Sequence, residues 1–144
     1  MKCEEWFTEE KYVDHAQEVV DGNTLRSKDG GQVRAKIFGG LTTTQIRNLL
    51  SLTAGLYDKV QQLPGENPVL NDELKSDIAY LRIQFVYNAG RDGSPNRTGV
   101  KDFVNEAQIL EALKLVKDKK TLVRFCRYME SLVAYFKFNG GKDK

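Results

Sequence analysis

The chain has 144 residues, of which 40% are hydrophobic and 29% charged, so its size and apolar content suit a single domain with one core. No apolar run approaches the roughly 18 residues that a transmembrane helix needs, which argues against a membrane protein. The net charge is +2 with a pI near 8.5, below the value of about 9 that marks a strong nucleic-acid footprint.

The N-terminal segment is acidic, since residues 1–21 hold seven acids against two bases. Residues 8–20 have the spacing of a short amphipathic helix, with Thr8 as its cap and Glu9 and Glu10 in the first turn, where the helix dipole favours acids. The segment has no apolar run at its start, so we expect no signal peptide and a cytoplasmic protein.

Residues 22–40 are rich in glycine and carry four bases against one acid. Asp29-Gly30 is a hairpin-turn signal, and Val33, Ala35 and Ile37 alternate with charged residues. These features predict a short hairpin or a loop near residues 24–38. The basic side chains could form an arm that reaches RNA or a neighbouring subunit, but a solvated loop is slightly favoured.

Four further amphipathic helices are predicted over residues 43–63, 72–89, 100–117 and 120–138. Thr42 and Gln45 match a capping box, and Asn71 precedes the acidic first turn of the helix 72–89. Ile83, Val86 and Tyr87 widen the apolar stripe of that helix, which predicts burial on more than one side. Gly90 is its expected stop, and a loop is expected from Arg91 to Gly99.

These helices predict an all-α fold, a compact bundle of about five helices in one domain over residues 1–144. Within it, residues 1–40 form the N-terminal helix and basic loop, residues 41–139 form the main bundle, and residues 140–144 form a disordered tail.

No catalytic or metal-binding pattern is present in the sequence. His15 is the single histidine, and Cys3 and Cys126 are far apart, so zinc and disulfide frameworks are not expected. No phosphate-binding loop ending in Gly-Lys-Ser/Thr occurs. We therefore expect no enzyme activity, no metal and no cofactor.

Arginines stand apart from the apolar stripes at Arg47, Arg82, Arg91, Arg124 and Arg127. The guanidinium group stays charged and donates paired hydrogen bonds, which suits phosphate. The plain alternatives are that Arg124 and Arg127 pair with Glu130 or with acids of the helix 100–117, and that Arg82 is a buried partner of Asp58 or Asp77. Tyr128 and Tyr135 could stack on bases, but packing in the core or at its rim is favoured for both.

Four segments together resemble a known family: Leu41-Thr42-Thr43-Thr44-Gln45-Ile46-Arg47, Leu81 to Arg91, Val100 to Val104, and Phe125 to Gly141. They resemble the small helical subunit of type III-A CRISPR effector complexes, the Csm complexes. The resemblance covers about residues 41–141, and residues 1–40 show little of it.

The resemblance implies a helical bundle that is not an enzyme. Several copies would stack along the effector complex beside its other subunits and line the groove that holds the guide RNA paired to target RNA. It makes Arg47, Arg82, Arg91, Arg124 and Arg127, with Lys137, candidates for RNA backbone contact. The alternative that stays open is a helical protein–protein adapter that never touches RNA.

Overall fold

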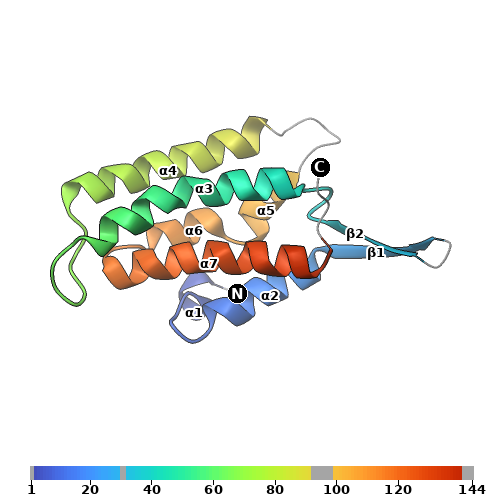
Figure 1. Ribbon diagram of the computed structural model, residues 1–144, viewed down its shortest axis with the longest axis horizontal. Helices are drawn as coiled ribbons and strands as arrows, with labels where there is room; N and C mark the ends of the chain where they lie inside the picture. Colours follow the sequence, from blue (N-terminus) through green and yellow to red (C-terminus); the bar gives the residue numbers. More distant parts are fainter. Residues whose placement is uncertain (1, 30–31, 92–98, 141–144) are drawn as a thin grey trace.

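The computed structural model describes residues 2–29, 32–91 and 99–140, and these form a helical bundle with one β-hairpin (Figure 1). The elements in chain order are α1 (Cys3–Trp6), α2 (Tyr12–Gly22), β1 (Thr24–Asp29), β2 (Gln32–Ile37), α3 (Thr43–Gln61), α4 (Asp72–Arg91), α5 (Gly99–Glu106), α6 (Ile109–Lys114) and α7 (Lys119–Phe138). The all-α prediction is confirmed. Among the described residues, no helix combines the length and the apolar character of a membrane span.

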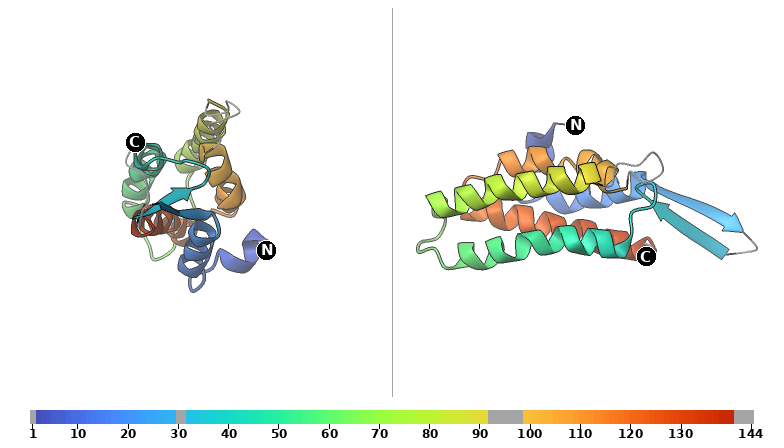
Figure 2. Two further views of the ribbon diagram at one scale, coloured as in Figure 1. Left: turned by 90° about the vertical axis from the view of Figure 1, so that its right-hand side faces the viewer. Right: turned by 90° about the horizontal axis from the view of Figure 1, so that it is seen from above.

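The hairpin, one of the two alternatives that the sequence predicted near residues 24–38, is present in the backbone. Strands β1 and β2 pair antiparallel from Thr24–Ile37 out to Asp29–Gln32. Figures 1 and 2 show the pair extending away from the end of the bundle, so its two strands form a sheet of their own.

Helix α7 lies against α2 on one side and α3 on the other (Figure 1). Its buried stripe includes Leu122, Phe125, Met129, Leu132 and Phe136, all of which lie fully inside the core. The stripe follows the predicted helical spacing, so the sequence identified the inward face of this helix correctly.

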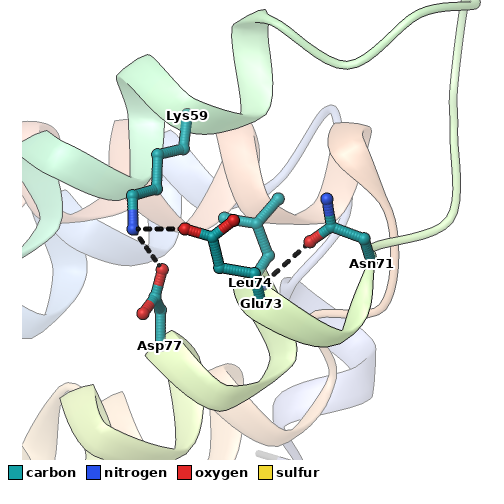
Figure 3. A network of polar contacts seen from close by, with 5 residues as sticks. All are labelled: Lys59, Asn71, Glu73, Leu74 and Asp77. Atoms are coloured by element: carbon teal, nitrogen blue, oxygen red, sulfur yellow. Dashed lines mark hydrogen bonds and ion pairs between the residues drawn. The ribbon is translucent and has the colours of Figure 1, made fainter.

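Local capping explains where the long helices begin. The Thr42 hydroxyl accepts a hydrogen bond from Gln45 N, and the Gln45 side chain accepts one from Thr42 N, which completes the predicted capping box of α3. Asn71 caps α4 as predicted, accepting from Leu74 N at 2.9 Å (Figure 3). Asp118 and Thr121 form a second capping box on α7, which the sequence analysis missed.

The ends of α3 and α4 are joined by a surface ion-pair network (Figure 3). Lys59 Nζ lies 3.2 Å from Glu73 Oε1 and 2.8 Å from Asp77 Oδ2. The hydrogen bonds that Lys59 donates to Asp77 and Glu73 raise the pKa of Lys59. Asp77 therefore bonds to Lys59 and does not serve as a buried partner of Arg82, which is exposed.

The predicted helix over residues 8–20 begins later than expected. α2 starts at Tyr12, and Thr8 instead accepts a hydrogen bond from Lys11 N in the preceding turn, at 3.2 Å. A separate short helix, α1, comes before it. Trp6 from α1 is buried and stacks on the His15 ring, with the ring centroids 3.9 Å apart.

The predicted helix over residues 100–117 is two helices. Gln108 has a left-handed backbone with φ of 53°, which interrupts the helical hydrogen bonding between α5 and α6. The Gln108 side chain accepts a hydrogen bond from the Trp6 indole, so a contact distant in sequence accompanies the break. Periodicity alone could not predict this break because the apolar spacing continues through it.

Two predictions for α4 are wrong. The helix continues through Gly90 to Arg91, so Gly90 does not stop it. Ile83, Val86 and Tyr87 are 61%, 53% and 64% exposed, so α4 is buried on one face and open on the other. The reason is position: α4 lies at the edge of the bundle, and its outer side has no helix over it (Figure 2).

Three further expectations fall partly or wholly outside the described residues. The expected loop from Arg91 to Gly99 has described ends only, with Arg91 closing α4 and Gly99 opening α5. The Gly30 of the predicted turn is not described. Of the expected tail over residues 140–144, only Gly140 is described; it follows α7 with a positive φ of 85°.

Candidate nucleic-acid interface

The first turns of α7 present cations at the edge of a groove. Lys120, Arg124 and Arg127 follow one another at i, i+4 and i+7, which places them on one side of the helix. Together with Lys119 they line a groove of about 330 Å³, whose other walls include Tyr12 and Val123. Its lining also includes the acids Glu9 and Glu66, so four cations face two carboxylates there.

Arg127 is exposed and lies over α3. Its Nη2 donates a hydrogen bond to the Tyr57 hydroxyl at 3.3 Å, and its guanidinium carbon lies 5.8 Å from the centre of the Tyr57 ring. A cation held against an aromatic ring keeps its charge and is restrained in position. Arg127 is therefore oriented by Tyr57 without being neutralised by it.

Arg124 is half-buried and contacts the N-terminal segment. Its Nη1 donates to the Phe7 carbonyl at 3.3 Å, and its guanidinium carbon lies 5.4 Å from the centre of the Phe7 ring. Arg124 thus has a structural role that the sequence did not reveal. No ion pair between described residues joins Arg124 or Arg127 to Glu130.

Arg47 and Lys137 lie at the opposite end of the same pair of helices. Arg47 is exposed on the first turns of α3, and Lys137 is exposed in the last turn of α7. Figure 1 shows the start of α3 beside the end of α7, because the two helices run antiparallel. The structure therefore brings Arg47, Arg124, Arg127 and Lys137 to one pair of helices, at its two ends.

Arg82 and Arg91 belong to another part of the molecule. Both are exposed on α4, which packs on α3, α5 and α6. Arg82 lines a groove of about 410 Å³ between α4 and α6, where the other cations are Lys75, Lys114 and Lys117. The sequence treated the arginines as a single set, whereas the structure separates these two from Arg124 and Arg127.

The sequence analysis missed the lysines of both grooves. Lys120 could have been found, because it continues the spacing of Arg124 and Arg127 by one helical turn. Lys75, Lys114 and Lys117 had no such signal, since they come from α4, α6 and the turn after α6 and meet only through the packing of those helices.

Tyr128 is not available for base stacking. It is fully buried, and its hydroxyl donates to the Ala107 carbonyl at 2.8 Å. Burial raises the pKa of its phenol above the usual value. The prediction that Tyr128 packs in the core is confirmed, and Tyr135 is half-buried against the same core.

The two cysteines are buried, and the single histidine, His15, is half-buried. Burial raises the pKa of the Cys3 and Cys126 thiols to about 12, so both stay protonated at neutral pH. Burial lowers the pKa of His15 to about 4. Among the described residues, no group of three or more His, Cys, Asp or Glu side chains is placed to hold a metal ion.

Comparison with known proteins identifies the family. Residues 23–142 match the family described as Csm2 Type III-A. The protein from Streptococcus thermophilus named "CRISPR system Cms protein Csm2" is 50% identical over 136 residues, covering 94% of this chain and 97% of the relative. The proteins of the same name from Mycobacterium tuberculosis strain H37Rv and Enterococcus italicus are 51% identical over 105 residues and 30% identical over 126 residues.

The Mycobacterium match covers 72% of this chain and 79% of the relative, and the Enterococcus match covers 88% and 87%. The family match begins at residue 23, so the expectation that residues 1–40 carry little resemblance is wrong for the hairpin. The match extends over most of the chain, and the chain belongs to the Csm2 family of type III-A CRISPR systems.

Proposed function

We propose that the protein is a non-catalytic small subunit of a type III-A CRISPR ribonucleoprotein that acts in antiviral defence in the cytoplasm. In this role it holds the guide RNA paired to target RNA through sequence-independent backbone contacts. The observation that carries the proposal is the line of cations on α7 beside a groove, in which Lys120 and Arg127 are exposed and Arg124 is half-buried. Family membership supports the assignment to a CRISPR complex.

The chemistry of this line suits phosphate. A guanidinium group has five N–H donors, so the bond from Arg124 to Phe7 leaves donors that a phosphate can accept from. Arg127 is exposed and is held by the Tyr57 hydroxyl and ring. Restrained, charged donors lose less conformational entropy on binding than freely rotating ones.

The contacts would be blind to base sequence. Guide pairing reads the target in RNA-guided systems, so the protein has to recognise only backbone and shape. This agrees with the burial of Tyr128, which removes one aromatic ring from the surface. Arg47 and Lys137 would extend the contact at the other end of α3 and α7. Arg82 and Arg91 lie on α4 instead of α7 and would need contacts with RNA of their own.

A single copy offers few contacts, so it would bind RNA weakly. Several stacked copies would extend one cationic track, and each further copy would bind at a high effective concentration. Every phosphate neutralised releases counterions, so the affinity should fall with salt at a log–log slope of about −0.7 per contact on single strands.

The test is an anisotropy titration of labelled single-stranded RNA and an RNA duplex across several salt concentrations. The variant Arg124→Ala/Arg127→Ala should bind more weakly, with a salt slope shallower by about 1.4 on single strands. Because Arg124 also contacts Phe7, a second variant, Lys120→Ala/Arg127→Ala, keeps that contact and should give the same result.

The matched control is Lys75→Ala/Lys114→Ala, which removes two charges from the groove between α4 and α6. It should leave the RNA affinity of a single copy, measured at protein concentrations at which copies do not associate, nearly unchanged. If a folded Arg124→Ala/Arg127→Ala protein bound RNA fully while the control variant lost binding, the α7 assignment would be wrong. RNA cleavage by the purified protein would contradict the non-catalytic role.

The adapter alternative has one observation in its favour. Large apolar side chains are exposed on α4, at Tyr80, Ile83, Val86 and Tyr87, and such a patch is typical of protein–protein contacts rather than RNA contacts. The two roles are compatible, since the α7 cations and the α4 patch occupy different helices.

A further inference from the structure

The outer side of α4 is an unpartnered apolar face. Tyr80, Ile83 and Tyr87 follow at i, i+3 and i+7, so they lie on one side of the helix, and each is more than 60% exposed. The opposite side of α4 is buried through Leu81 and Phe85. Water contacts with this many large side chains are unfavourable, which indicates a surface that is covered in the working protein.

Cations surround this face where α4 meets α6. Ile83, Val86 and Tyr87 line a groove of about 580 Å³ that includes Arg82 and Lys114. The neighbouring groove of about 410 Å³ shares Arg82 and Lys114 and adds Lys75 and Lys117. Its lining contains no acid, and Glu111 is the acid that lines the larger groove. We call these two grooves together the α4–α6 surface.

The cations of the α4–α6 surface have no acidic partner within the part of the chain that the structure describes. The ion pairs between described residues involve Lys59 on the other side of α4, with Glu73 and Asp77. Lys75, Arg82, Lys114 and Lys117 are all exposed. A covering partner should therefore supply carboxylates around an apolar centre.

The acidic face of α2 has the complementary character. Asp14, Glu18 and Asp21 follow at i, i+4 and i+7 and are exposed. Val13, which precedes Asp14 in the sequence, is 38% exposed. No ion pair between described residues involves these acids; Asp21 accepts a hydrogen bond from the Asn139 side chain at 3.2 Å.

The two surfaces lie on opposite sides of the bundle. Figure 1 shows α4 along the upper edge and α2 along the lower edge, and the end-on view in Figure 2 shows the same separation. One copy can therefore bind two neighbouring copies at once, one through each surface. A contact between two different surfaces that does not close on itself produces an open row of copies.

We propose that the α4–α6 surface of one copy binds the acidic α2 face of the next copy. This inference rests on the proposed function only in that copies stack, and it assigns the surfaces that do so. Tyr87 and Ile83 form the apolar centre, and Arg82 and Lys114 meet the carboxylates of Asp14 and Glu18. Arg82 thereby takes a role in protein contact. The proposed contact does not cover the cations of α7, which therefore stay accessible to RNA.

The test is sedimentation velocity of the full chain at low salt over a range of concentrations, with charge-reversed variants. Lys75→Glu/Lys114→Glu gives the α4–α6 surface acidic character, and Asp14→Lys/Glu18→Lys gives the α2 face basic character. Each variant alone carries two like-charged surfaces, so each should associate about tenfold more weakly or worse than the wild-type chain. An equimolar mixture of the two variants should regain association, because each mixed junction pairs opposite charges.

The equimolar mixture of the two variants is the decisive measurement. An interface between two α4–α6 surfaces related by two-fold symmetry would leave Asp14→Lys/Glu18→Lys associating like wild type, which would overturn the proposal. Wild-type protein that stays monomeric at high concentration and low salt would also overturn it, as would a mixture that regains nothing. Circular dichroism checks that the variants are folded.

RNA titration of the same variants separates this inference from the proposed function. If stacking is unaffected by both reversals while RNA binding still depends on Arg124 and Arg127, only the surface assignment is wrong. If Lys75→Glu/Lys114→Glu abolishes RNA binding by the monomer, the α4–α6 surface binds RNA and the stacking contact lies elsewhere.

Discussion

The contact between His15 and Trp6 should make the stability of the protein depend on pH. The His15 ring stacks on Trp6 with an interplanar angle of 8°, and its Nε2 is buried without a hydrogen-bond partner. Burial lowers the pKa of His15 to about 4 from its ordinary value of 6.5. The folded protein therefore resists protonation that the unfolded chain accepts.

The direction and size of this pH effect on the free energy of unfolding follow from proton linkage. Above pH 6.5 both states are neutral at His15 and the residue contributes no pH dependence. As the pH falls from 6.5 towards 4, the unfolded chain binds a proton that the folded state excludes, so the free energy of unfolding decreases. At pH 5 the loss is at most about 2 kcal/mol, since His15 retains some solvent contact.

The assay is urea unfolding at pH 7 and pH 5, followed by the fluorescence of Trp6, the chain's single tryptophan. The comparison variant is His15→Phe, which keeps an aromatic ring against Trp6 and removes the titrating group. Its midpoint should fall less than that of wild type between the two pH values, with a difference of about 1 M urea. The carboxylates titrate equally in both proteins, so the comparison cancels them. Equal losses in the two proteins would refute the reasoning.

Two further predictions concern the backbone and a helix cap. A Cβ added at Gly99 would lie 2.8 Å from the backbone nitrogen of Leu41, so Gly99→Ala should lower the free energy of unfolding by about 1–3 kcal/mol. Gly55→Ala is its control, because Gly55 is exposed within α3 with nothing near a new Cβ. This change should raise the free energy of unfolding by about 0.5–1 kcal/mol. If thermal or urea unfolding gave both substitutions an effect of the same sign, the contact with Leu41 would be contradicted. Asp118→Ala removes the acceptor that Thr121 N bonds at 2.9 Å, which should cost about 1 kcal/mol in urea unfolding; an unchanged midpoint would show that the α7 cap contributes little.

Local chemistry made several features predictable. Thr42 and Gln45 form a capping box because the two side chains and two backbone amides lie within one turn, so no distant residue is needed. The same holds for Asn71 at the start of α4. The buried stripe of α7 was also predictable, since apolar residues at helical spacing must share a face.

Other features depend on contacts between distant residues. The break at Gln108 accompanies a hydrogen bond from Trp6, which is far away in sequence. The failure of the predicted Gly90 stop shows a similar limit, because a glycine permits a helix end without enforcing one. At these two positions the periodic pattern of apolar residues does not indicate which distant residues pack nearby.

The candidate site likewise has features that the sequence predicts and features that depend on tertiary packing. The sequence by itself determined the helical class, the starts of α3 and α4 and the set of arginines outside the apolar stripes, because these follow from spacing along one chain segment. Only the tertiary structure decided that Arg127 lies against Tyr57, that Arg82 belongs with Lys114, and that the outer side of α4 stays exposed. The physical reason is that periodicity tells which residues share a helix face, whereas packing decides which faces meet another helix and which meet solvent.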